Sequence, residues 1–85
     1  MKTFTYTIKD KIGIHARPAG LLVKKAKEFE SIITIEKNGK AAAATKLMAI
    51  MSMGIKFGDT IHVTIEGADE DKAATEMEAF FSANL

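Results

Sequence analysis

The stretch GIHARPAG, residues 13–20, places a histidine and an arginine at the start of an amphipathic helix. Pro18 marks that start, because a proline in the first turn of a helix gives up no intrahelical hydrogen bond. Free main-chain amides and the helix dipole favour a phosphate or carboxylate at this position. Arg17 adds a planar guanidinium that matches phosphate oxygens. The pattern therefore predicts a neutral His15 ring beside a phosphate site, arranged for attack of a ring nitrogen on phosphorus.

The start of this helix has two registers. If Pro18 takes the first helical position, Arg17 is the N-cap, and the bias of a residue before proline against helical geometry favours this register. In the other register the helix begins at Ala16 and His15 is the N-cap. In both, we expect free amides around Ala16 and Arg17, and on Ala19 and Gly20, to point toward the region of His15.

The spacing of apolar residues predicts seven elements in the order β-α-β-β-α-β-α. Strands are expected at residues 2–8, 32–37, 40–44 and 60–66, with Asn38-Gly39 as a type I′ hairpin turn. Helices are expected at residues 18–29, at 45–54 with Thr45 as N-cap, and after an N-cap at Asp69. Half-buried strands favour an antiparallel sheet with helices on its other side. The expected inward helical positions are Ala19, Leu22, Ala26, Phe29, Leu47, Ile50, Met51, Ala73, Met77 and either Phe80 or Phe81.

Composition excludes several classes of protein. The chain has 85 residues, 12 basic and 11 acidic side chains and a net charge of +1, which is too balanced for a typical nucleic-acid-binding protein. It has no cysteine, so disulfides and zinc-thiolate sites are excluded. No apolar run approaches the ~18 residues of a membrane span, and the N-terminus lacks a signal peptide. We expect a cytoplasmic protein without membrane insertion.

The sequence closely resembles the HPr family, the histidine-containing phosphocarriers of the bacterial sugar phosphotransferase system. The resemblance covers nearly the whole chain, including residues 13–26, 38–40 and 51–59. It implies one HPr-like phosphocarrier domain over residues 1–85. It implies an α+β open-faced β-sandwich, with a four-stranded antiparallel sheet and three helices on one face. It further implies that His15 caps the first helix and carries the phosphoryl group on Nδ1, that Arg17 stabilises the phosphate, and that the backbone of Ala16 and Arg17 forms the phosphate cradle.

The implied function is a phosphoryl relay without a cofactor or metal. Enzyme I, charged by phosphoenolpyruvate, would phosphorylate His15, which would then pass the group to enzyme IIA domains of sugar transporters. Such a protein is a phosphoryl carrier rather than a stand-alone enzyme, and we expect a monomer. Partners are expected to bind around His15. One part of the expected binding surface is a basic stripe on the first helix. The other part is formed by methionines and leucines of the second helix, which are too numerous for all of them to face the core. The expected partner-binding residues are Gly20, Lys24, Lys27, Leu47, Met48 and Met51, with an inward core position as the alternative for Leu47 and Met51.

Two positions are assigned little function. Many family members carry a serine at the start of the second helix that HPr kinase phosphorylates, and this chain has Lys46 there, so regulation by that kinase is doubtful. His62 alternates with Thr60 and Thr64 and is expected to be a solvated residue on the outer side of its strand.

Three alternatives are kept. The first is a regulatory phosphocarrier of a nitrogen-related relay. The second is a non-transferring adaptor of the same fold. The third is a ferredoxin-like binding module such as a metallochaperone, against which the absence of cysteine counts strongly.

Overall fold

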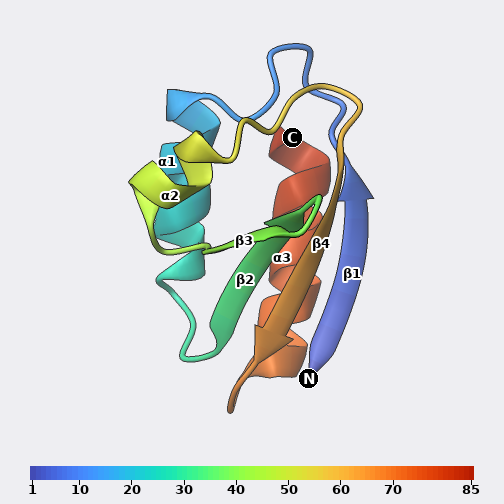
Figure 1. Ribbon diagram of the computed structural model, residues 1–85. Coiled ribbons are helices and arrows are strands. Elements are labelled where there is room, and N and C mark those ends of the chain that lie inside the picture. The colour runs from blue at the N-terminus through green and yellow to red at the C-terminus, as the bar shows by residue number, and fades with distance from the viewer.

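Four antiparallel strands form one sheet in the order β1-β4-β2-β3. The computed structural model describes residues 1–85 (Figure 1). The strands are β1 (Lys2–Thr7), β2 (Ile32–Lys37), β3 (Lys40–Ala43) and β4 (Thr60–Glu66). The helices are α1 (Ala16–Ala26), α2 (Leu47–Ser52) and α3 (Glu70–Asn84). The predicted element order is therefore confirmed.

The β2–β3 hairpin is closed by the predicted two-residue turn. Asn38 and Gly39 have φ values of 51° and 83°, in the left-handed region that a type I′ turn requires. This turn sets Lys37 opposite Lys40. Because side chains alternate along a strand, this register turns Ile33 and Ile35 of β2 into the core.

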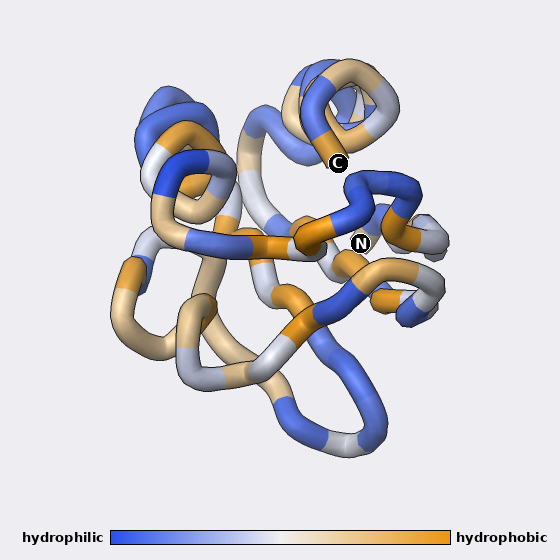
Figure 2. Tube along the Cα trace, turned by 90° about the horizontal axis from the view of Figure 1, so that it is seen from above, coloured by the Kyte–Doolittle hydropathy of each residue, from blue (hydrophilic) through white to orange (hydrophobic).

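The helices cover one side of the sheet, as the view from above shows (Figure 2). Ala19, Leu22 and Ala26 of α1 are buried, at the helical spacing expected from the sequence, and Pro18 is buried as well. Phe81 of α3 is fully buried and meets Phe4 and Tyr6 edge-on, with ring centroids 5.6 and 5.7 Å away. Of the two candidate phenylalanines, Phe81 is thus the core residue. The core lies between this layer of helices and the sheet.

The second helix departs from the prediction at its start. It begins at Leu47 with Lys46 at the N-cap position, so Thr45 is not the cap. The preceding chain is still held to the hairpin, because the Ala44 amide donates to the Ile33 carbonyl at 2.8 Å and the Lys46 amide to the Ala43 carbonyl at 3.0 Å. With this later start only Ile50 of α2 is buried. The expected inward positions of Leu47 and Met51 are therefore wrong: both side chains are exposed.

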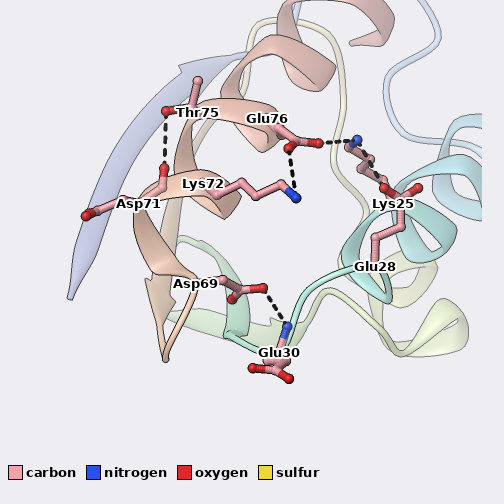
Figure 3. A network of polar contacts seen from close by, with 8 residues as sticks. All are labelled: Lys25, Glu28, Glu30, Asp69, Asp71, Lys72, Thr75 and Glu76. Carbon is pink, nitrogen blue, oxygen red and sulfur yellow. Dashed lines mark hydrogen bonds and ion pairs between the residues drawn. The ribbon is translucent and has the colours of Figure 1, made fainter.

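The first helix is also shorter than expected, because it ends at Ala26 and leaves Phe29 outside it, half-buried against the core. Lys25, near the end of α1, forms two ion pairs. Its Nζ lies 2.8 Å from Glu76 of α3 and 3.3 Å from Glu28 (Figure 3). The hydrogen bonds to Glu76 and Glu28 raise the pKa of Lys25, and Lys25 lowers the pKa of Glu76. These contacts tie α1 to α3.

Asp69 stands at the predicted N-cap of α3, but its side chain does not cap the helix. Its carboxylate instead accepts hydrogen bonds from the main-chain amides of Glu30 and Ser31, both at 2.9 Å, and from the Ser31 hydroxyl. The Ser31 hydroxyl and the Glu30 amide lower the pKa of Asp69. The side chain therefore joins the start of α3 to the loop that follows α1.

No helix combines the length and the apolar composition that crossing a membrane requires.

Candidate functional site

The loop between β1 and α1 carries His15 and is fixed to the segment between α2 and β4. The Ile8 amide donates to the Asp59 carbonyl, and the Ile14 amide donates to the Ile55 carbonyl at 3.1 Å. Gly13 has φ +84°, and a Cβ on it would lie 2.5 Å from the Ile55 carbonyl oxygen. Only a glycine therefore lets the two segments pack this closely, one residue before Ile14 and two before His15.

Helix α1 begins at Ala16 and has His15 as its N-cap, which confirms the register that the family resemblance implied rather than the one that Pro18 favoured. The Ala19 amide donates to the His15 carbonyl at 2.9 Å and closes the first turn. Pro18 is the third helical residue and is buried, a position where the missing N–H is not needed for the helix. The His15 side chain makes no capping hydrogen bond, so its ring nitrogens are not engaged by the helix.

The first turn of α1 has two main-chain amides without an acceptor in the protein, those of Ala16 and Arg17. They are the two amides expected from the sequence to form the phosphate cradle, and their binding of phosphate stays a prediction. The amide of Ala19 was expected to be free as well, and that expectation is wrong because it is bonded to the His15 carbonyl. The first turn contains no acidic residue, so the positive end of the helix dipole is not neutralised there.

A shallow depression of about 260 Å³ opens beside this helix start. His15 and Arg17 both line it, His15 being half-buried and Arg17 exposed. The complete lining is Asp10, His15, Arg17, Pro18, Leu21 and Asn84. The protein has no group of three or more histidine, cysteine or acidic side chains that could hold a metal ion. The depression is open to solvent, and the charged side chains that line it are one guanidinium, Arg17, and one carboxylate, Asp10.

Sequence reasoning missed three residues of the depression: Asp10, Leu21 and Asn84. Leu21 could have been predicted from the sequence, because it lies one helical turn after Arg17 and therefore on the same face of the helix. Asp10 and Asn84 are brought there by packing between distant segments. The Leu85 carbonyl accepts hydrogen bonds from the Lys9 and Asp10 amides at 2.7 and 2.8 Å, which joins the end of α3 to the loop. No local pattern encodes that contact.

The residues expected to bind partners lie on two neighbouring helices, and we call them together the α1–α2 surface. Gly20 and Lys24 of α1 are exposed, as is Lys27, which directly follows α1, and neither lysine forms an ion pair. A Cβ on Gly20 would meet no atom within 4 Å, so the backbone is open to an approaching partner. The α2 members of the surface are Leu47, Met48 and Met51, all exposed.

The exposed apolar groups of α2 distinguish this surface from an ordinary solvated face. Met48 exposes 75% of its area. Methionine side chains are flexible and polarisable, and they adapt to different partner surfaces. Helices α1 and α2, which carry five of the six residues expected from the sequence, are packed together (Figure 1).

Comparison with known proteins decides the family. A family model described as "PTS HPr component phosphorylation site" matches residues 2–83. The chain belongs to the HPr family. The protein is accordingly a phosphocarrier of the phosphotransferase system, the system of sugar transport in which HPr proteins work.

Individual HPr proteins are similar over most of their length. The chain is 42% identical to the phosphocarrier protein HPr of Lysinibacillus sphaericus over 73 residues, which is 86% of this chain and 83% of that protein. It is 36% identical to HPr of Mycoplasma genitalium over 99% of this chain and 97% of that protein. The HPr-like protein Crh of Halalkalibacterium halodurans is 45% identical over 86% of this chain and 87% of its own.

Solved HPr structures have the same fold. An HPr from Thermoanaerobacter tengcongensis superposes with a TM-score of 0.93 at 39% identity, covering 99% of this chain and 94% of that chain. The four-stranded antiparallel sheet with three helices is therefore the HPr fold, as the sequence predicted.

Proposed function

We propose that His15 carries the phosphoryl group of this HPr protein and that Arg17 stabilises it. The observation that carries the proposal is the geometry at the start of α1. An uncapped His15 ring lines the same depression as Arg17, next to two main-chain amides that have no acceptor. These are the groups that an in-line transfer of PO₃ requires: a nucleophile, and positive charge fixed around the moving oxygens.

The transfer starts from a neutral imidazole. The lone pair of Nδ1 attacks phosphorus, and the bond between phosphorus and the donor's leaving atom breaks as the new P–N bond forms. The leaving atom keeps the electron pair of the broken bond. The proton on Nε2 of His15 stays in place, so the phosphorylated ring balances part of the charge on PO₃. The amides of Ala16 and Arg17 and the Arg17 guanidinium hold the phosphoryl oxygens.

The reverse step delivers the group to an acceptor. The same groups stabilise the same transition state in both directions, so no further catalytic residue is needed. The site lies in a shallow depression rather than a closed cleft, which lets different partners reach one ring. We propose Enzyme I as the donor and enzyme IIA domains as acceptors. Residues 1–85 then act as one phosphocarrier domain.

The proposed docking site for these partners is the α1–α2 surface. Its lysines carry free positive charge next to exposed apolar side chains, which fits an acidic partner with an apolar centre. Regulation by HPr kinase is not part of the proposal. The residue at the N-cap of α2 is Lys46, which has no hydroxyl group to phosphorylate.

The two histidines of the chain provide a matched test. His62 lies exposed on β4, opposite Thr5 and Glu36 and away from the helices. Incubation with Enzyme I and phosphoenolpyruvate should add one acid-labile phosphoryl group to the wild type and to His62→Ala. The same incubation should add none to His15→Ala. Phosphorylation of His15→Ala, or its loss in His62→Ala, would refute the assignment.

The same assay separates the alternative relay. Incubation with an Enzyme I of the sugar branch and with one of the nitrogen-related branch shows which donor is faster. A faster reaction with the second would place this phosphocarrier in the regulatory branch, with His15 in the same chemical role.

A further inference from the structure

Lys37, the last residue of β2, has its side chain on the helix side of the sheet. Side chains alternate along a strand, and Ile33 and Ile35 are buried on the inner face, so Lys37 continues that face at the end of the strand. β2 runs toward the end of the molecule at which α1 begins (Figure 1). The Lys37 side chain is only 16% exposed. A lysine buried to this extent needs partners for its charge.

The Lys37 ammonium binds both ends of residues 54–59, which link α2 to β4. Its Nζ donates to the Gly54 carbonyl at 2.9 Å and lies 2.7 Å from Oδ2 of Asp59. The same carboxylate oxygen accepts the Lys56 amide at 2.7 Å. The Lys37 ammonium, followed by the Lys56 amide, lowers the pKa of Asp59. Because this linking segment contains no helix or strand, contacts of this kind fix its course.

The linking segment in turn supports the loop that carries His15. The Ile55 carbonyl accepts the Ile14 amide at 3.1 Å, and Ile14 directly precedes His15. Ile55 lies between the two residues that Lys37 binds, and its buried side chain anchors the middle of the segment in the core. A connected set of contacts therefore leads from Lys37, through the linking segment, to the residue before the phosphoryl acceptor.

We infer that Lys37 is a positioning residue for phosphoryl transfer, because it fixes the linking segment on which the His15 loop rests. The inference rests on the proposed function, since it takes His15 as the phosphoryl carrier. Lys37 does not line the depression and is not part of the α1–α2 surface. Its loss therefore leaves partner binding intact and lowers the fraction of molecules in which Nδ1 of His15 is aligned for in-line attack. The maximal rate of transfer falls, while the concentration that gives half of that rate does not change.

Lys40 provides a matched control, because it lies directly opposite Lys37 in the hairpin, is exposed and forms no ion pair. Phosphorylated Enzyme I is mixed with increasing concentrations of each variant. We expect Lys37→Met to lower the maximal rate of transfer to His15 about tenfold, with the half-saturating concentration changed less than about twofold. Lys40→Met, which removes the same charge, should match the wild type. Lys37→Arg still has donors for both acceptors and should keep most of the rate.

Hydrogen exchange of single amides separates positioning from a general loss of stability. The Ile14 amide should exchange faster in Lys37→Met than in Lys40→Met, because its acceptor lies in the linking segment. The Ala44 amide, which donates to the Ile33 carbonyl at the base of the hairpin at 2.8 Å, should exchange at the same rate in both variants. Exchange that becomes faster by the same factor at both amides would show a general loss of stability and overturn the inference.

The outcomes separate this inference from the proposed function. If the wild type is phosphorylated on His15 and Lys37→Met has the maximal rate of Lys40→Met, the positioning role is refuted while the proposed function stands. The same holds if only the half-saturating concentration changes, or if Lys37→Arg is as slow as Lys37→Met. If Lys37→Met does not fold, Asp59→Asn is measured, and an unchanged maximal rate in that variant also refutes the role. A wild type that Enzyme I does not phosphorylate overturns both proposals.

Discussion

Replacing Gly13 by alanine should disturb the support of His15 more than any other glycine substitution of equal size in the loops nearby. Gly13 has φ +84°, and its added Cβ would lie 2.5 Å from the Ile55 carbonyl oxygen and 2.7 Å from Lys56 Cα. Ordinary contacts of a Cβ are at least about 3.4 Å. Because both neighbours are main-chain atoms, a side chain cannot simply move aside. The loop has to separate from the segment before β4.

Gly58 is the matched control. Its φ is +86°, but a Cβ there would meet nothing within 4 Å. Gly58→Ala therefore incurs only the conformational cost of a left-handed residue, about 1 kcal/mol of unfolding free energy. Gly13→Ala adds a steric cost of about 1–3 kcal/mol and weakens the hydrogen bond from the Ile14 amide to the Ile55 carbonyl, about 1 kcal/mol. We expect Gly13→Ala to be less stable than Gly58→Ala by about 2 kcal/mol or more.

Urea and thermal unfolding followed by circular dichroism measure this difference. For a domain of this size, 2 kcal/mol corresponds to a midpoint lower by about 8–16 °C. Phosphorylation by Enzyme I should also be slower in Gly13→Ala than in Gly58→Ala under conditions where both are folded, because His15 is two residues away. Equal stability of the two variants would refute the close approach of the two segments.

Three further substitutions have distinct expected results. Gly20→Gln should raise the unfolding free energy by about 0.5–1 kcal/mol, since it replaces a helix-interior glycine with open space around it, yet raise the KM with Enzyme I by covering the α1–α2 surface. A stabilised variant with unchanged KM would contradict the proposal that Enzyme I binds to the α1–α2 surface. Arg17→Ala should slow phosphorylation about 100-fold with an unchanged thermal midpoint, and a rate near that of the wild type would exclude phosphate stabilisation by Arg17. Asp69→Asn should lower the thermal midpoint at neutral pH, because the carboxylate that accepts three hydrogen bonds is lost. The pKa of Asp69 lies below its ordinary value of 3.8, so its contribution is full above that pH and disappears as the pH falls through the folded-state pKa. The two midpoints should therefore converge in acid, and a constant gap would contradict the role of the charge.

Local patterns predicted the elements well because each depends on nearby residues. Alternation identified β4, and Asn38-Gly39 identified the hairpin, because its φ values suit that dipeptide. The start of α1 was harder. Pro18 fits either the first or the third helical position. A proline disfavours helical geometry in the residue before it, here Arg17, and this argument favoured the first position, which is wrong. Tertiary contacts of Ile14 with Ile55 hold the loop so that the helix begins at Ala16.

Contacts between distant segments could not be predicted from the sequence. Lys25 has the spacing of a solvated lysine, and only the packing of α1 beside α3 brings Glu76 to it. Asn84 lines the depression for the same reason. The sequence did identify His15 and Arg17 as a pair, because a histidine followed by arginine and proline at a helix start has a local chemical meaning. Asp69 shows what local patterns do not predict. Its place at the N-cap position of α3 was predicted, but its hydrogen bonds with the amides of Glu30 and Ser31 were not.

The most direct test of the central claim is the NMR spectrum of the protein after phosphorylation by Enzyme I. The account predicts phosphorus bonded to Nδ1 of His15. It also predicts that the amide protons of Ala16 and Arg17 move strongly downfield as they donate to the phosphoryl oxygens. The Ala19 amide, already bonded to the His15 carbonyl at 2.9 Å, should move little. Phosphorus on any other residue, or on His15 with the Ala16 and Arg17 amides unmoved, would contradict the account.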